Sequence, residues 1–192
     1  MTKKKSKKEL ILEAGLELFF EKGFEKTTID DIINLAECGK GTFYRYFSNK
    51  DSLLEELENV FVTTLSKEIQ KNCCSTMGLK EYLTASLNTF LSVFKQHQRL
   101  GLIRFEREQR LNLEARRASF DKVLPNIHAL RDYITNAIKT GVVRQVDPEN
   151  VVGMVLGVAH FYLVRDFKLG KPFSPKELED SVDIILYGVA KS

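Results

Sequence analysis

Hydrophobic residues recur every three or four positions along most of the chain, which is the period of an amphipathic helix. The first stripe predicts a helix over residues 6–22 and consists of Ile11, Ala14, Gly15, Leu18 and Phe19. Gly23 follows this stripe directly and predicts the end of the helix. The strict apolar–polar alternation that predicts a sheet is not found, so we expect an all-α fold.

Two short helices separated by a tight turn are predicted next. Thr28 is a favoured N-cap residue, and Asp31 three positions later completes a capping pattern for a helix that begins at Ile29. After the three residues 37–39, a second short helix is predicted over residues 40–47. Two short helices behind a longer one form the pattern of a helix-turn-helix in a three-helix unit.

Longer helices are predicted for the rest of the chain. The polar residues of 48–51 favour the start of a helix whose apolar stripe runs towards the cysteines at 73–74. Asp147 before Pro148, and the Ser-Pro-Lys-Glu run at 174–177, predict two helix starts with proline at the first helical position. Further helices are expected at about residues 79–96, 98–109, 112–140, 148–169 and 175–190.

The composition is that of a globular protein with one uneven feature. Hydrophobic residues make up 43% of the 192 residues, and the formal net charge is +3. Five lysines crowd into residues 3–8. Such a basic arm is either a solvated terminus or an arm that holds phosphates, and the sequence leaves both interpretations open.

The apolar segments are too short or too interrupted for export or membrane insertion. The stretch after the lysines is broken by Glu13 and Glu17, which does not fit a signal peptide. The apolar stretch from Val151 to Val164 is roughly 14 residues long, below the ~20 residues that span a bilayer. We therefore expect a cytoplasmic protein with no membrane partner.

The reactive residue types do not form a catalytic or metal-binding pattern. Cys38, Cys73 and Cys74 lack the spacing of a disulfide framework or a metal knuckle, so reduced thiols are expected, with a sensor role for the adjacent pair as the alternative. The three histidines lie on separate segments, and neither a glycine-rich phosphate loop nor a nucleophile elbow occurs. We expect no catalytic residue, no metal site and no cofactor, and an enzyme has little support.

The second short helix carries the candidate DNA contacts. Phe43 and Phe47 share one face and are expected to anchor the helix, which leaves the opposite face for the major groove. The predicted DNA-binding residues are Thr28, Lys40, Gly41, Thr42, Tyr44, Tyr46 and Lys50. Lys40 and Thr42 are the candidates for reading base edges. The alternatives are core packing for the tyrosines, solvation for the lysines and a cap for Thr28.

This segment resembles the DNA-binding domain of TetR-family repressors. The run Lys-Gly-Thr-Phe-Tyr-Arg-Tyr-Phe at residues 40–47, followed by Lys50, is the densest part of a similarity that covers residues 9–54. The resemblance implies a helix-turn-helix DNA-binding domain over residues 1–50 and a helical effector-binding and dimerisation domain over residues 51–192.

The turn between the two short helices departs from the pattern of the family. The family's usual Ala-Gly-Val-Ser is Ala-Glu-Cys-Gly here, so Glu37 replaces a glycine and Gly39 replaces a capping serine. Glycine adopts positive φ without a penalty, and serine caps a helix with its hydroxyl. We therefore expect a slightly strained turn and a weaker cap.

The resemblance also implies that the last two helices pair with those of a second subunit. Gly153 and Gly157 would allow close helix approach, and a two-fold dimer would read two half-sites. The predicted interface residues are Val155, Leu156, Ala159, Val182, Ile185 and Val189. The alternative is that Val151 to Val164 is wholly an intramolecular core helix.

A ligand cavity between these ends is implied by the same resemblance. The predicted pocket residues are Phe90, Phe94, Phe105, Phe120, Leu124 and His128. The many phenylalanines favour a small apolar effector, although bundle interiors are usually filled by such side chains.

The sequence therefore predicts a ligand-responsive repressor that binds a palindromic double-stranded operator as a homodimer. An effector in the C-terminal domain would tilt the fourth helix and release the DNA. The alternative is an architectural DNA-binding protein that has no effector.

Overall fold

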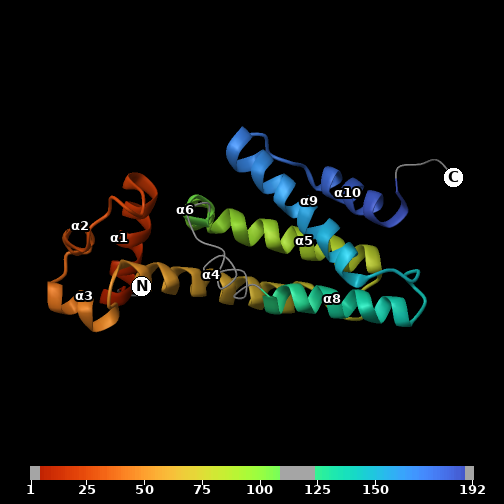
Figure 1. The fold of residues 1–192 in the computed structure, drawn as a ribbon, viewed down its shortest axis with the longest axis horizontal. Coiled ribbons are helices and arrows are strands. Elements are labelled where there is room, and N and C mark those ends of the chain that lie inside the picture. The colour runs from red at the N-terminus through yellow and green to blue at the C-terminus, as the bar shows by residue number, and fades with distance from the viewer. Residues whose placement is uncertain (1–4, 109–123, 189–192) are drawn as a thin grey trace. The chain divides into compact units, whose positions relative to one another are not determined.

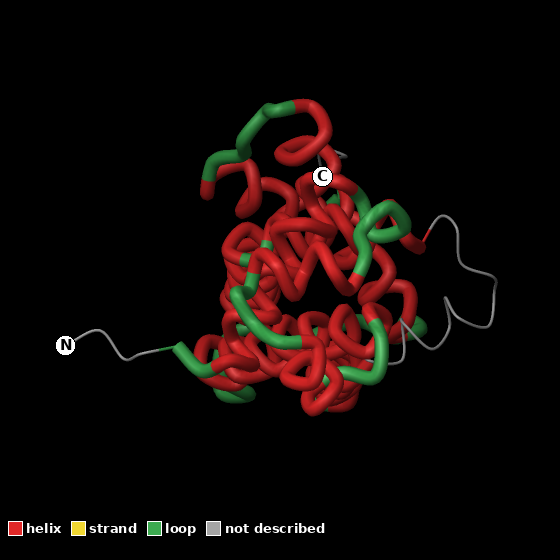
Figure 2. The backbone as a smooth tube through the Cα atoms, turned by 90° about the vertical axis from the view of Figure 1, so that its left-hand side faces the viewer, coloured by secondary structure: helices red, strands yellow, loops and turns green. Residues whose placement is uncertain are grey.

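The computed structural model describes residues 5–108 and 124–188. In these residues the backbone forms helices and loops but no strand, so the all-α prediction is confirmed (Figure 2). The helices, labelled as in Figure 1, are α1 (Lys7–Lys22), α2 (Ile29–Leu35), α3 (Lys40–Tyr46), α4 (Lys50–Asn72), α5 (Leu79–Gln96), α6 (Gln98–Glu108), α8 (Leu124–Lys139), α9 (Pro148–Leu169) and α10 (Pro175–Tyr187).

Helix boundaries follow local capping chemistry. Thr28 and Ser174 each form the predicted capping box, and Gly170 ends α9 in the left-handed conformation with φ 61°. Ser6 forms a further capping box with Glu9 at the start of α1. Each such N-cap contributes about 1 kcal/mol to helix stability.

One predicted helix boundary differs from the structure, and one lies outside the described residues. Helix α10 ends at Tyr187, three residues before the predicted end at 190, because Gly188 leaves the helix with φ 78° while its N–H still bonds to the carbonyl of Ile184. The start that we predicted at residue 112 lies outside the described residues, which resume at Leu124.

The chain divides into two compact units. The first contains the described residues of Met1–Thr63 and His97–Phe120, and the second contains those of Thr64–Gln96 and Asp121–Ser192. Helix α4 therefore contributes its first part to one unit and its last part to the other.

The first unit packs α1, α2, α3 and the start of α4 around buried aliphatic and aromatic side chains. Ile11, Phe19, Ile32 and Leu53 are each 2% exposed or less. Gly15 lies on the buried face of α1, where a Cβ would come to 2.5 Å from a methyl group of Leu53. A glycine inside a helix costs about 1 kcal/mol relative to alanine, and here it permits close packing.

The second unit contains α5, α8, α9, α10 and the end of α4. Figure 1 shows α9 and α10 beside α5, and these three helices pack on one another. Their shared core includes Leu83, Leu87, Val155 and Leu178. A ring stack adds to this core, since the rings of buried Tyr82 and half-buried Tyr133 lie parallel with centroids 3.6 Å apart.

Polar contacts fix α9 against α10. The Tyr162 hydroxyl donates to the carbonyl of Glu177 at 2.8 Å and lies 2.9 Å from the Ser181 hydroxyl. Arg165 Nη1 lies 2.6 Å from Glu177 Oε1, and this guanidinium, with the Ser174 N–H, lowers the pKa of Glu177 from 4.5 to about 2.

The helices among the described residues are too short or too polar to cross a lipid bilayer.

The contacts of Glu177 with Arg165 and Ser174 should make the stability of the second unit sensitive to acid. Because its folded pKa is depressed, its contribution is fully present above the ordinary value of 4.5 and is lost as the pH falls towards about 2. We expect Glu177→Gln to unfold more readily than wild type at neutral pH and to lose less stability between pH 4.5 and 2. Urea unfolding across this range checks the prediction. Glu179→Gln, exposed on the same helix, should follow the wild-type profile.

Candidate nucleic-acid interface

The recognition helix α3 is held by one buried face. Phe43 is fully buried and Phe47 is 4% exposed, and their ring centroids lie 5.9 Å apart. Helix α3 packs on both α1 and α2. The predicted anchor is therefore confirmed, and the rest of this short helix is left to face outwards.

The outward face of α3 carries most of the predicted DNA contacts. Lys40, Gly41, Tyr44 and Tyr46 are exposed, Tyr44 by 49%, and Thr42 is partly buried beside them. A Cβ at Gly41 would meet open space, so the backbone there is accessible to a ligand. These residues lie on the same short helix with much of their surface accessible, and their contact with DNA stays a prediction.

Lys40 is paired on the protein surface. Its Nζ lies 3.3 Å from Asp30 Oδ1, with side-chain exposures of 64% and 71%. An ion pair this exposed contributes little to stability, at most about 1 kcal/mol. A DNA phosphate or base edge can therefore compete for the ammonium.

Arg45 is a candidate that the sequence reasoning missed. Its Nη2 donates to the Tyr46 hydroxyl at 2.9 Å, and its guanidinium lies 4.8 Å from the centre of that ring. Arg45 lies three residues after Thr42, which is one helical turn, so helical spacing was the signal that could have found it.

The turn before α3 has the strain and the weak cap that we expected. Glu37 has φ 47°, and it is the only residue other than glycine with positive φ in the described part of the chain. The N–H groups of Glu37 and Cys38 bond to the carbonyls of Asn34 and Ile33, which is a Schellman motif with Glu37 at the position that favours glycine. Gly39 caps α3 without a side-chain hydrogen bond.

Thr28 uses its polar groups within the protein. Its N–H and its hydroxyl both donate to Asp31 Oδ2, at 3.0 and 2.8 Å. These bonds and the nearby Lys22 lower the pKa of Asp31 to about 2. A phosphate accepts hydrogen bonds but donates none, so it would have to compete with this carboxylate for the same donors.

Lys50 closes the loop between α1 and α2. Its ammonium donates to the carbonyls of Phe24, Glu25 and Thr27 at 2.8, 3.1 and 3.3 Å, and it lies 4.6 Å from the centre of the Phe24 ring. These contacts give Lys50 a structural task, and its predicted contact with DNA is not tested by them. Buried Thr27 supports the same loop by donating to the carbonyls of Leu18 and Gly23.

The predicted pocket residues have different environments. Phe90 and Phe94 are half-buried, and Phe94 lies 5.3 Å from Phe167 of α9, a neighbour that we did not predict. His128 is exposed. Phe120, together with the side chains of Phe105 and Leu124, lies outside the described part of the chain.

The predicted interface residues differ in how far their own subunit buries them. Val155, Ala159 and Val182 are 3%, 3% and 0% exposed and form part of the core of the second unit, so a second subunit has little access to their side chains. Leu156 and Ile185 are half-buried, and Val189 lies outside the described residues. The periodicity placed the apolar helix correctly but not which of its apolar faces points inwards.

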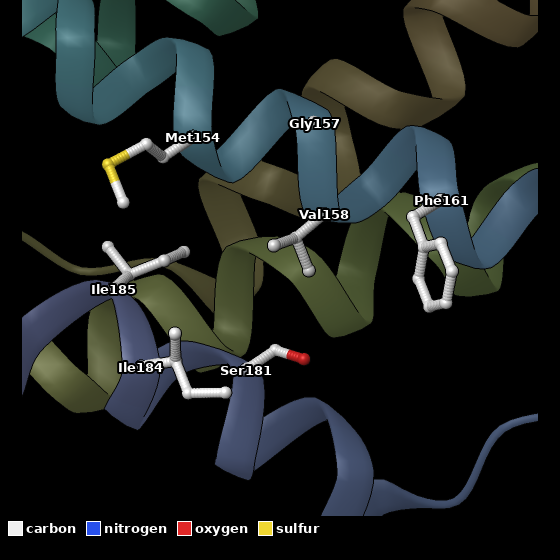
Figure 3. A pocket seen from close by; sticks show the side chains of 7 residues that line it. All are labelled: Met154, Gly157, Val158, Phe161, Ser181, Ile184 and Ile185. Atoms are coloured by element: carbon white, nitrogen blue, oxygen red, sulfur yellow. The ribbon is translucent and has the colours of Figure 1, made fainter. Parts of the chain in front are cut away.

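An apolar groove lies between α9 and α10. Its volume is about 340 Å³, and Met154, Val158 and Phe161 of α9 face Ser181, Ile184 and Ile185 of α10 across it (Figure 3). Gly157 also lines the groove. Met154, Phe161 and Ile184 are 49%, 57% and 49% exposed, so this side of α9 and α10 presents apolar surface to the solvent.

The cysteine pair has one partly buried thiol, Cys73, and one exposed thiol, Cys74. Burial raises the pKa of Cys73, whereas hydrogen bonding to Thr76 lowers that of Cys74. Within the described residues, His, Cys, Asp and Glu side chains do not gather into a group of three that could hold a metal ion.

Together, the buried anchor, the tight turn and the exposed polar face of α3 define a helix-turn-helix DNA-binding protein. A sequence profile described as bacterial regulatory proteins of the tetR family matches residues 11–57. The HTH-type transcriptional regulator YhgD of Bacillus subtilis is 30% identical over 176 residues, covering 89% of each chain. The fatty acid metabolism regulator protein of the same organism is 24% identical over 149 residues, covering 76% of this chain and 75% of that protein.

Solved structures have the same fold. PfmR of Thermus thermophilus has a TM-score of 0.76 at 22% identity, covering 95% of this chain and 96% of PfmR. FadR of Bacillus subtilis, solved with stearoyl-CoA, has a TM-score of 0.75 at 20% identity, covering 95% of this chain and 99% of FadR. The chain belongs to the TetR family of bacterial regulatory proteins. It is a DNA-binding transcriptional regulator, and this family does not consist of enzymes.

We expect replacement of Lys50 to lower the stability of the fold rather than to remove a contact with a DNA phosphate. Lys50→Met keeps an unbranched aliphatic side chain but removes the three hydrogen bonds and the contact of the ammonium with the Phe24 ring, so we expect unfolding to become easier by about 1–3 kcal/mol. Urea unfolding measures this change. Lys26→Met, an exposed lysine of the same loop, is the matched control and should unfold like wild type. Unchanged stability together with a salt dependence of DNA binding reduced by about one charge per subunit would instead make Lys50 a phosphate contact.

Proposed function

We propose that this regulator is an effector-responsive repressor that binds a palindromic operator as a homodimer. The observation that carries the proposal is the exposed polar face of α3, which is opposite the fully buried Phe43. A seven-residue helix offers few contacts to DNA, so one subunit alone would bind weakly. Two subunits related by a two-fold axis would read half-sites about one helical turn apart.

The groove between α9 and α10 supports the homodimer. A Cβ at Gly153 or Gly157 would meet open space, so the backbone of α9 is accessible to another helix at close range. The exposed apolar residues Met154, Phe161 and Ile184 flank that opening. A second copy seated there would remove their apolar surface from water, at roughly 25 cal/mol per Å² buried.

The effector that we propose carries a long apolar acyl chain. Phe90, Phe94 and Phe167 form a half-buried aromatic cluster on α5 and α9, with centroids 6.2 and 5.3 Å apart along the series. The similarity to a fatty acid metabolism regulator and to a fold solved with stearoyl-CoA favours long-chain acyl-CoA as the first compound to test. The cluster offers the apolar contacts that such a chain needs.

The proposed signal passes along the chain between the two units. Among the described residues, the backbone crosses from one unit to the other at residues 63–64 and 96–97. An effector held by the second unit would act on α4, which belongs to both units, and change the spacing of the two α3 helices of the dimer. A coupling of about 1–3 kcal/mol would change operator affinity from several-fold to about a hundredfold.

Selection from random duplex DNA tests the proposal first. We expect the purified protein to recover a palindrome at both low and near-physiological salt, and Thr42→Ala or Tyr44→Phe to weaken its binding. Adding stearoyl-CoA should then release this duplex, as followed by fluorescence anisotropy. Binding that vanishes with salt and gives no motif would favour the architectural alternative. A palindrome that neither stearoyl-CoA nor shorter acyl-CoAs release would exclude the proposed effector class.

Gly157→Leu tests the subunit interface. The new side chain would project into open space in a single subunit, so we expect its fold to be retained while close approach of a second α9 is blocked. Sedimentation should show a dimer for wild type and a monomer for the variant, and operator affinity should fall at least tenfold. Lys139→Leu adds the same side chain at an exposed position of α8 outside the groove and should remain dimeric. A Gly157→Leu dimer of wild-type strength would place the interface elsewhere.

A further inference from the structure

The turn that aims α3 has two local weaknesses. Glu37 holds a left-handed conformation that side chains with a Cβ adopt at a cost, and Gly39 offers no side chain to cap the following helix. Both weaknesses lie within the three residues that set the direction of the recognition helix. Packing of Phe43 fixes where α3 lies, but the turn decides the angle at which the helix starts.

Hydrogen bonds connect the turn to α2 and to the start of α1. The N–H groups of Glu37 and Cys38 bond back to α2. The Glu37 carbonyl accepts its bond instead from Lys7 Nζ, at 3.0 Å, across 30 residues of sequence. This carbonyl belongs to the peptide group that joins Glu37 to Cys38, so a bond to it restrains the peptide orientation just before α3.

Lys7 is well placed to hold that carbonyl. It is the first residue of α1, and the capping box of Ser6 and Glu9 fixes this end of the helix. Its neighbour Lys8 forms an ion pair with Glu56 of α4, so the same end of α1 also contacts another helix of the first unit. Lys5, by contrast, pairs with Glu13 of α1 itself.

We propose that Lys7 is a positioning residue for DNA recognition, which holds the strained Glu37 turn so that α3 meets the major groove at the correct angle. Lys7 then acts through the geometry of the protein rather than by contact with a phosphate. This role rests on DNA binding by the family and goes beyond the proposed operator and effector. It also separates Lys7 from the other lysines of the basic arm.

Four proteins test the proposal: Lys7→Met, Glu37→Gly, the double variant, and Lys5→Met as the control with the same loss of charge. Affinity for the selected duplex is measured by fluorescence anisotropy over a range of salt concentrations. We expect Lys7→Met to bind roughly three- to tenfold more weakly at every salt concentration, with the slope of log K against log salt unchanged. Glu37→Gly should restore most of the affinity in the double variant, because glycine adopts this turn without an external support.

Two outcomes would overturn the proposal. If Lys7→Met lowers the salt slope by about one charge per subunit and Glu37→Gly gives no rescue, Lys7 contacts phosphate. If Lys7→Met binds as tightly as Lys5→Met and wild type, the bond to the Glu37 carbonyl has no role in recognition.

Amide hydrogen exchange of Cys38 and Thr42, measured without DNA, keeps the test independent of the operator. These two amides should exchange faster in Lys7→Met than in Lys5→Met and return towards wild type in the double variant. Unchanged exchange in Lys7→Met would contradict the proposed restraint. Failure of the wild-type protein to select a motif would instead speak against the proposed function, since the exchange experiment does not depend on it.

Discussion

Burial of Phe43 is the interaction on which the DNA-binding unit depends. A helix of seven residues is unstable on its own, because the entropy lost in forming the first turn exceeds the stabilisation from so few hydrogen bonds. Full burial of one phenylalanine contributes about 1.5–3 kcal/mol and requires α3 to keep that side chain in the core. The same constraint determines the exposed face, since Tyr44 and Arg45 must point away when Phe43 points inwards. Stability and recognition are thus set by opposite faces of one short helix.

The loop between α1 and α2 and the turn before α3 are stabilised by side chains that are distant in the sequence. Lys50 satisfies three carbonyls of the loop between α1 and α2, and Lys7 satisfies the carbonyl of strained Glu37. In both cases a flexible ammonium with three donors reaches carbonyl groups of a loop or turn. Two of the lysines near the DNA-binding surface therefore have structural tasks, which charge alone would not have indicated.

Features that depend on neighbouring residues, such as helix ends, could be predicted from the sequence. Contacts between residues far apart in the sequence could not. Capping boxes at Thr28 and Ser174 and the glycine after α9 set helix ends locally, and the departure at Glu37 correctly predicted a strained turn. The partners of Lys50 lie 23 to 26 residues away, and helical periodicity carries no information about them. DNA contacts by Thr28, Lys40 and Tyr46 remain predictions.

Helix α9 shows why the interface residues could not be assigned from periodicity. A helix that is apolar on all sides is usually buried on all sides, but its sequence does not say which face is covered by its own subunit. Here Val155 and Ala159 pack inside, whereas Met154 and Phe161 remain exposed along an open glycine surface. Burying one face stabilises the subunit, and the exposed apolar face then remains to be covered. This second requirement links the fold of one subunit to the two-fold arrangement that we propose for binding DNA, because the residues that would join two copies lie directly behind the core that α9 completes.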